Sequence, residues 1–176
     1  GVGGYCLEKD PFIFMDSAKK KGYEPLLARD ARLVSDAMID VVARTVTSFL
    51  KKEKAQVKNP KIALLGFAFK GKPVTSDVRG STTVILTKKL QHAGYTNIHG
   101  YDGAARKEDI VMHGVKHVEK VEQGFKDADV VVVMNNHPDF ETLDIRGLLA
   151  KAKTPVLFFD TWSLYDADEV KKVKGV

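Results

Sequence analysis

The only cysteine of the chain, Cys6, lies in a segment whose residue types suit covalent catalysis. Glycines at positions 1, 3 and 4 precede it, and a backbone without Cβ atoms can approach a ligand closely. The following apolar residues indicate a helix that begins near Cys6, where backbone N–H groups and Lys9 favour a thiolate. A helix also places the carboxylate of Asp10 on the same face as the sulfur. These are the parts of a nucleophilic active site, although a small buried cysteine beside a helix cap has the same pattern.

A second group of candidate residues follows a predicted buried strand over 61–67. Phe69 and Lys70 emerge at the carboxyl edge of this strand, and Arg79 stands just before a predicted helix that begins near Ser81. An arginine beside a helix N-terminus forms an anion site. Its guanidinium can bind two phosphate oxygens at once, and the free N–H groups of the helix favour a negative charge. The sequence therefore predicts a phosphate-bearing ligand here. A solvated loop lysine is the alternative interpretation of Lys70.

The N-terminal part of the chain is predicted to be helical, with a first helix over about 11–21. Gly22–Pro25 interrupts it, and a long helix starts at Asp30 or Ser35. Its apolar stripe has to be covered, either by the next domain of the same chain or by a second copy. Residues 51–60 are polar and predict a linker. The stripe comprises Leu33, Ala37, Val41, Val42, Thr45, Val46, Phe49 and Leu50.

After Pro60 the pattern alternates between strands and helices. The strands are nearly continuous apolar runs, which is typical of parallel strands covered on both faces. This alternation predicts an α/β fold with an open, doubly wound parallel sheet, whose ligands bind at the carboxyl ends of the strands. Predicted strands cover 61–67, 97–102, 129–134 and 155–160, and predicted helices cover 81–93, 107–113, 121–127, 145–153 and a tail from about 166.

Composition narrows the classes of function. One cysteine in 176 residues excludes an intramolecular disulfide, so a cytoplasmic protein is expected. No apolar run approaches the ~20 residues of a membrane span. The net charge of +5 is compatible with an anionic partner, but the lysines lie scattered or on helix faces without interleaved aromatics, which argues against nucleic acid. The histidines have no metal-ligand spacing with Cys6 or with each other, so no metal is expected. His137, at the predicted ligand edge, is interpreted as a polarising group or as a strand-end cap.

Two motifs resemble one known family. Gly1-Val-Gly-Gly-Tyr-Cys-Leu-Glu-Lys-Asp-Pro11 resembles the active-site signature of nucleotide-sugar 6-dehydrogenases, the UDP-glucose and UDP-N-acetylmannosamine dehydrogenase superfamily. Leu65-Gly-Phe-Ala-Phe-Lys-Gly71 and Ser76-Asp-Val-Arg-Gly-Ser81 resemble the signature of that family's UDP-binding domain. The resemblance covers the part of such an enzyme from the catalytic cysteine onward. It implies a segment 1–55 with the cysteine loop and a dimerisation helix, followed by a Rossmann-like UDP-sugar domain over 56–176.

The resemblance also implies site residues and a reaction. The family oxidises the C6 alcohol of a UDP-sugar to a carboxylate with NAD, through a cysteine thiohemiacetal and a thioester. A homodimer through the long helix is implied as well. The implied roles are Cys6 as nucleophile, Asp10 as the group that activates water, Gly3 and Gly4 against the sugar, Phe69 and Lys70 on the UDP-sugar, and Lys9 and Arg79 near NAD.

Several points remain open at the level of sequence. Lysine before Asp10 suits the UDP-glucose branch, whereas Pro11 suits the N-acetylmannosamine branch, so either sugar is compatible. No glycine cluster has the spacing of a dinucleotide fingerprint, and Asp102 is therefore interpreted as structural and not as a ribose-binding acid. The chain starts without methionine inside a motif, so a fragment without the NAD domain, inactive alone, is expected. The alternative function is a non-catalytic nucleotide-binding and dimerisation module.

Overall fold

A computed structural model describes all residues, 1–176. The centre of the molecule is a five-stranded sheet in the order β3-β2-β1-β4-β5, and every strand pair is parallel. This order reverses direction at β1, as in doubly wound folds. The predicted α/β, Rossmann-like sheet is therefore confirmed. The strands are β1 (Ile62–Leu65), β2 (Ile98–Tyr101), β3 (Lys116–His117), β4 (Val130–Val133) and β5 (Leu157–Asp160).

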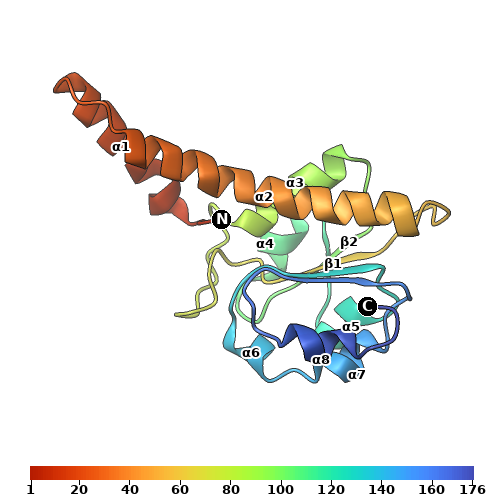
Figure 1. Ribbon diagram of the computed structural model, residues 1–176. Coiled ribbons are helices and arrows are strands. Elements are labelled where there is room, and N and C mark those ends of the chain that lie inside the picture. Colours follow the sequence, from red (N-terminus) through yellow and green to blue (C-terminus); the bar gives the residue numbers. More distant parts are fainter.

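Helices cover both faces of the sheet (Figure 1). On one face, the apolar side chains of β1 and β4 pack with α2, α3 and α4, as Ile62, Val46 and Leu86 illustrate. On the other face, the alternate side chains pack with the helices of the C-terminal half, as Ala63 and Phe125 illustrate. The helices are α1 (Tyr5–Lys20), α2 (Leu26–Glu53), α3 (Thr82–His92), α4 (Lys107–Val111), α5 (Val121–Phe125), α6 (Pro138–Glu141), α7 (Ile145–Leu149) and α8 (Ala167–Lys171).

The long helix α2 lies across one face of the sheet and projects beyond it together with α1 (Figure 1). Only its C-terminal half is buried, through Ile39, Val42, Val46 and Leu50. These residues repeat every three or four positions and form the stripe that faces the domain. Leu33, which belongs to the predicted stripe, is 62% exposed. The domain of the same chain therefore covers part of the apolar surface of α2 and leaves the rest open.

The polar segment after α2 is attached to the sheet domain. The side chain of Lys54 is 6% exposed, its Nζ lies 3.1 Å from Asp129 Oδ1, and it donates a hydrogen bond to the carbonyl of Lys153. Asp129 also accepts a hydrogen bond from the backbone N–H of Lys61 at 2.8 Å. The residue that ends α2 is thus fixed to the beginning of β1 and β4.

The structure corrects several predicted boundaries. Helix α1 begins at Tyr5, which agrees with the helix start expected near Cys6 and lies six residues before the range of 11–21 predicted for the first helix; it contains Pro11. Helix α2 begins at Leu26, before both predicted starts, because Pro25 permits a helix directly after it. The strand Lys116–His117 and the helix Pro138–Glu141 were not predicted, since elements of two and four residues have no periodicity to detect.

Candidate functional site

The carboxyl ends of the strands meet at one edge of the sheet, since Leu65 pairs with Tyr101 and with Val133, and Val133 pairs with Asp160. The next residue after β2, Asp102, is 7% exposed. Its Oδ2 accepts hydrogen bonds from the backbone N–H groups of Phe67 at 2.6 Å and Ala68 at 2.9 Å. Its Oδ1 accepts two more from the turn after β2. The structural interpretation of Asp102 is correct: its carboxylate shapes the loop that follows β1.

Two asparagines after β4 hold the same loop from the other side. Asn135 donates from Nδ2 to the carbonyl of Ala68 at 3.1 Å, and Asn136 accepts at Oδ1 from the N–H of Gly71 at 3.0 Å. A Cβ on Gly71 would lie 2.1 Å from the backbone nitrogen of His137, so only glycine fits there. The neighbouring loops are thus in direct contact at the sheet edge. From the sequence alone, neither asparagine was assigned a role.

His137 caps a helix in the structure. Its Nδ1 accepts the backbone N–H of Asp139 at 3.3 Å at the start of α6, and its side chain is 7% exposed. Of the two interpretations offered by the sequence, these contacts favour the structural one.

The glycine segment that carries Cys6 docks on the loop between β1 and α3. Gly4 donates its N–H to the carbonyl of Gly80 at 2.9 Å and has a φ of 100°, a conformation that favours glycine. A Cβ on Gly4 would lie 2.8 Å from the ring of Phe69, and one on Gly3 would lie 2.5 Å from the carbonyl oxygen of Gly80. The structure therefore brings together two motifs that are more than sixty residues apart.

Cys6 is the second residue of α1 and is exposed. This confirms the expectation that the cysteine stands at a helix N-terminus, and it contradicts the alternative of a buried cysteine. Asp10 follows one turn later on the same helix, and its carboxylate lies 3.1 Å from Lys9 Nζ. A side-chain hydrogen bond to Asp10 raises the pKa of Lys9 above its usual value.

Two cationic groups flank the ring of Tyr5, beside the cysteine. Lys9 Nζ lies 5.5 Å and the Arg79 guanidinium 5.2 Å from the ring centroid. Arg79 Nε and Nη2 also donate to the carboxylate of Asp77, at 3.0 and 2.7 Å. These bonds raise the pKa of Arg79 and lower that of Asp77. The two residues predicted to lie near a cofactor thus share one surface next to Cys6.

Lys70 has no ion-pair partner in the structure. Its Nζ lies 5.2 Å from the centroid of the Phe69 ring, the same ring that packs on Gly4. A half-buried ammonium group without a carboxylate partner is suited to bind an anion. No group of three or more His, Cys, Asp and Glu side chains is close enough together to hold a metal.

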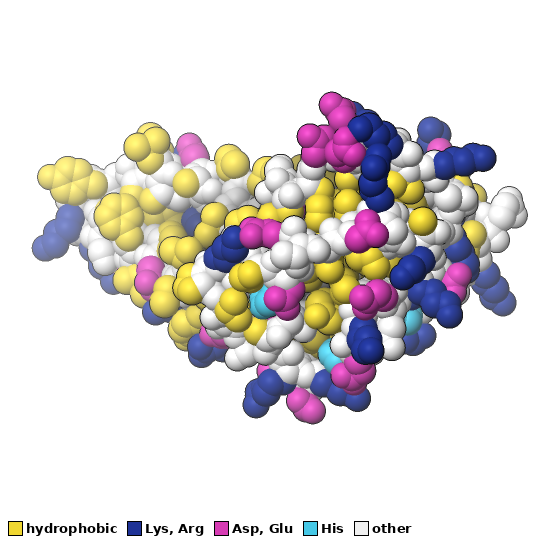
Figure 2. Space-filling view, turned by 90° about the horizontal axis from the view of Figure 1, so that it is seen from below, with side chains coloured by type: hydrophobic (Ala, Val, Ile, Leu, Met, Phe, Trp, Pro, Cys, Tyr) yellow, Lys and Arg dark blue, Asp and Glu magenta, His cyan; other side chains and the backbone are white.

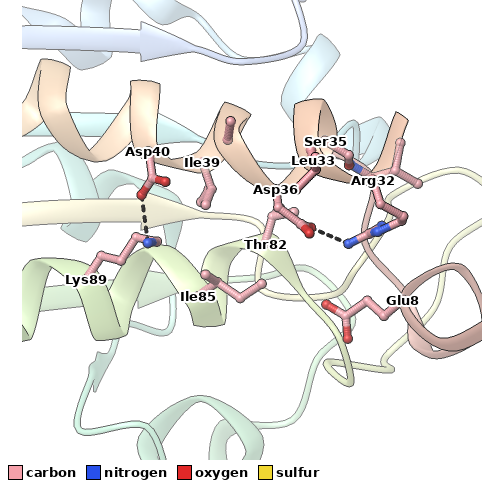
Figure 3. A pocket seen from close by; sticks show the side chains of 12 residues that line it. Glu8, Arg32, Leu33, Ser35, Asp36, Ile39, Asp40, Thr82, Ile85 and Lys89 are labelled. Carbon is pink, nitrogen blue, oxygen red and sulfur yellow. Dashed lines mark hydrogen bonds and ion pairs between the residues drawn. The ribbon is translucent and has the colours of Figure 1, made fainter. Parts of the chain in front are cut away.

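Two pockets of similar size lie along α2. One, of about 390 Å³, is mainly apolar and is bordered by Met134, Thr161 and Trp162 at the carboxyl ends of β4 and β5. The indole Nε1 of Trp162 donates to the carbonyl of Met134 at 2.9 Å, which fixes the ring at this edge. The other pocket, of about 400 Å³, lies among α1, α2 and α3 and has charged walls that include Arg32 and Glu8 (Figure 3).

Comparison with known proteins agrees with this geometry. Residues 63–167 match the model of the UDP-glucose/GDP-mannose dehydrogenase family, UDP binding domain. The chain is 30% identical over 176 residues to a UDP-glucose 6-dehydrogenase of Rhizobium meliloti (strain 1021), covering 98% of this chain and 38% of the relative. It is also 30% identical over 144 residues to a UDP-N-acetyl-D-mannosamine dehydrogenase of Pyrococcus horikoshii, covering 82% of this chain and 31% of the relative.

Solved structures give the same result. A UDP-D-ManNAc dehydrogenase from Pyrococcus horikoshii superposes with a TM-score of 0.76 at 26% identity, over 95% of this chain and 36% of that one. The fold is therefore a Rossmann-like α/β domain preceded by a helical segment. The chain belongs to the UDP-glucose/GDP-mannose dehydrogenase family, and most of its sheet region is the UDP-binding domain of that family. It spans between about a third and two fifths of the length of these relatives. No helix of the structure is long and apolar enough to cross a membrane.

Proposed function

We propose that this chain is the UDP-sugar-binding and cysteine-bearing part of an NAD-dependent nucleotide-sugar 6-dehydrogenase. One observation carries the proposal: the segment that bears Cys6 docks through Gly4 on Gly80 and Phe69 of the UDP-binding domain. A nucleophile on that segment is thereby held beside the edge of the sheet where doubly wound domains bind their ligands. The substrate is a UDP-sugar, of the UDP-N-acetylmannosamine or the UDP-glucose type.

Lys70 and Phe69 bind the UDP-sugar. The unpaired ammonium group of Lys70 supplies a charge-assisted contact to phosphate, and the ring of Phe69 packs between this lysine and the glycine segment. Gly3 and Gly4 bring their backbone beside the sugar, because the absence of Cβ atoms at both positions lets this segment lie directly against Gly80 and the ring of Phe69. The C6 end of the sugar then lies towards Cys6.

Cys6 is the nucleophile of the second oxidation. Its thiolate attacks the carbonyl carbon of the sugar aldehyde, and the carbonyl oxygen takes up a proton to give a thiohemiacetal. Loss of a hydride and a proton from this adduct gives a thioester. Asp10 accepts a proton from water, the hydroxide attacks the thioester carbonyl, and the acid leaves with release of the thiol. Exposure of Cys6 and its place one helical turn before Asp10 support these roles.

Lys9 and Arg79 contact the cofactor. Both cations lie over the ring of Tyr5 beside Cys6, and two neighbouring cations suit the diphosphate of a dinucleotide. NAD held by these residues would supply the acceptor for the hydrides that the sugar loses. The chain has no dinucleotide fingerprint of its own, so most of the cofactor site belongs to another part of the enzyme.

The exposed apolar surface supports a homodimer through α2. Hydrophobic side chains gather over the end of the molecule formed by α1 (Figure 2), and the adjacent half of α2 exposes Leu27 at 90% and Val34 at 63%. A contiguous apolar surface of this kind marks an interface in a protein of this size. A second copy of the same helix pairs with it about a two-fold axis.

Calorimetric titration with UDP tests the binding site. Lys70→Ala removes a charge-assisted contact worth about 1.5–3 kcal/mol, so the affinity for UDP falls by roughly ten- to a hundredfold. Arg79→Ala is the matched control: it removes a cation of the same loop assigned to NAD and leaves UDP binding nearly unchanged. Loss of UDP binding in Arg79→Ala, with Lys70→Ala unaffected, would reverse the assignment of these residues.

A further inference from the structure

Pro11 lies in the interior of α1 and leaves one carbonyl of the helix without its backbone donor. In an α-helix the carbonyl of residue 7 accepts the N–H of residue 11, and proline has no N–H. The unpaired carbonyl belongs to Leu7, which directly follows Cys6. The turn that carries the thiol therefore lacks a hydrogen bond that the same turn of an ordinary helix would have.

Arg32 of α2 supplies the missing donor. Its Nη1 donates to the carbonyl oxygen of Leu7 at 3.2 Å, across 25 residues of sequence. Asp36, one turn further along α2, pairs with Nη2 of the same guanidinium, and Figure 3 shows the two side chains facing each other in the pocket between the helices. The Arg32 side chain is only 12% exposed, and its Nε is buried without a hydrogen-bond partner. The bonds to Leu7 and Asp36 are therefore what orients the guanidinium.

Apart from the docking of Gly4 on Gly80 and the contact of Arg79 with Tyr5, few contacts hold α1 in place. Met15 is the only buried residue of α1, so the helix is held by polar contacts near its start more than by packing. On the other side of Cys6, the N–H of Val2 donates to Ser35 Oγ at 2.9 Å, and Ser35 also belongs to α2. Helix α2 thus forms hydrogen bonds with the cysteine segment at Val2, before the thiol, and at Leu7, after it.

We propose that Arg32 is the positioning residue of Cys6. It replaces the N–H that Pro11 lacks and so keeps the first turn of α1 helical, with its free backbone N–H groups towards the thiol. Its importance for catalysis rests on the proposed function, in which Cys6 is the nucleophile; its effect on the turn does not. Asp36 holds Arg32 in the orientation that this bond requires.

The 176-residue chain itself provides the test, because Cys6 is its only cysteine and reports on the turn directly. In Arg32→Met, exchange of the amide hydrogens of Glu8, Lys9 and Asp10 accelerates by about three- to tenfold, since the turn opens more often. Alkylation of Cys6 by iodoacetamide at neutral pH slows by about threefold, because an open turn no longer directs the backbone N–H groups of the helix N-terminus towards the sulfur. Arg32→Lys, which keeps the charge and a donor, shows a smaller change.

Restoring the backbone donor separates the hydrogen bond from the charge. In the double variant Arg32→Met with Pro11→Ala, residue 11 can donate to Leu7, so both readouts return to the wild-type values although the arginine is absent. Arg44→Met, on the same helix and exposed, is the matched control and changes neither readout. If Arg32 only stabilised the fold, Arg32→Met would lower the melting temperature, but the faster amide exchange would not be confined to this turn.

Two results would overturn the proposal. One is an Arg32→Met protein whose exchange and alkylation equal those of Arg44→Met. The other is a double variant that stays as altered as Arg32→Met, since the charge and not the hydrogen bond would then be responsible. Neither result depends on turnover. Failure of the proposed function would instead be seen in a longer enzyme that contains this sequence, as unchanged acid formation after Cys6→Ala.

Discussion

Lys54 and Asp129 form a buried ion pair that joins the long helix to the sheet. The two side chains are 6% and 1% exposed, and Asp129 Oδ1 has no hydrogen-bond donor apart from the nearby ammonium charge. A carboxylate buried to this extent is stable only while its counter-charge is present. The attraction within the pair therefore adds little to the stability of the fold, whereas removal of one partner is strongly destabilising.

Replacement of Lys54 by methionine should be strongly destabilising. Lys54→Met keeps the aliphatic length but leaves Asp129 buried without a cation, so the free energy of unfolding should fall by about 3–5 kcal/mol in urea titration. Lys52→Met is the matched control, because Lys52 is 83% exposed and should change stability by less than about 0.5 kcal/mol. Equal stability of the two variants would show that the buried pair does not hold α2 to the sheet.

His99 predicts a pH dependence of stability. Burial, followed by the charges of Lys61 and Lys116, lowers its pKa from 6.5 to about 4. The unfolded chain therefore binds a proton between pH 6.5 and 4 that the folded protein does not, and stability is lost as the pH falls through this window. In His99→Gln the unfolding free energy should depend less steeply on pH in this window. The slope should decrease by the amount that corresponds to up to about one bound proton. His92→Gln, at an exposed histidine, is the matched control.

At the level of elements, α2 carries two apolar stripes, one covered by the domain of the same chain and one exposed. Ile39, Val42, Val46 and Leu50 face the domain of the same chain and are buried. The side chains of a second stripe are 40–90% exposed. Successive members are seven, four and three residues apart, as along the seam of a coiled coil. This stripe consists of Leu27, Val34, Met38 and Val41.

Self-association should depend on the second stripe. Val34→Glu places a charge in the seam, so sedimentation equilibrium at tens of micromolar should shift from dimer towards monomer, while the melting of the sheet domain stays unchanged. Met112→Glu is the control, since Met112 is 72% exposed on another part of the molecule. A wild-type chain that sediments as a monomer at these concentrations would contradict the proposed dimer.

At the scale of the whole molecule, the UDP-binding domain and the cysteine segment are already assembled against each other. The contact of Gly4 with Gly80 and Phe69 lies within this chain, so these residues by themselves hold the cysteine segment against the loop proposed to bind the UDP-sugar. The residues proposed to contact the cofactor, Lys9 and Arg79, have side chains that are 50% and 68% exposed. Binding of a UDP-sugar and oxidation of that sugar are therefore expected to be separable.

The isolated chain should bind UDP without oxidising any UDP-sugar. Because most of the NAD site is proposed to lie elsewhere, incubation with NAD and UDP-glucose or UDP-N-acetylmannosamine should give no increase in absorbance at the NADH band, whereas titration of the same sample with UDP should release heat. Steady NADH production by the purified chain would disprove this division of the site. A chain that neither binds UDP nor turns over would contradict the substrate assignment itself.

The sequence by itself determined the elements with strong periodicity and the identity of the motifs. The apolar runs of β1 and β4 predicted a parallel sheet because strands buried on both faces admit no polar position, and Cys6 and Arg79 were found by motif. Elements of two or four residues, and the starts of α1 and α2, were missed or misplaced, since short segments and helix ends are set by contacts and not by periodicity.

The tertiary structure decided how distant residues combine. Only the folded chain showed that Gly4 packs on Phe69, that Asp102 shapes the loop after β1, and that half of α2 stays uncovered. It also matched Arg32 with the carbonyl that Pro11 leaves free, which no spacing along the chain could reveal. The physical reason is common to all of these: hydrogen bonding and packing act over a few ångströms in space, whereas sequence patterns report only on neighbours within one element.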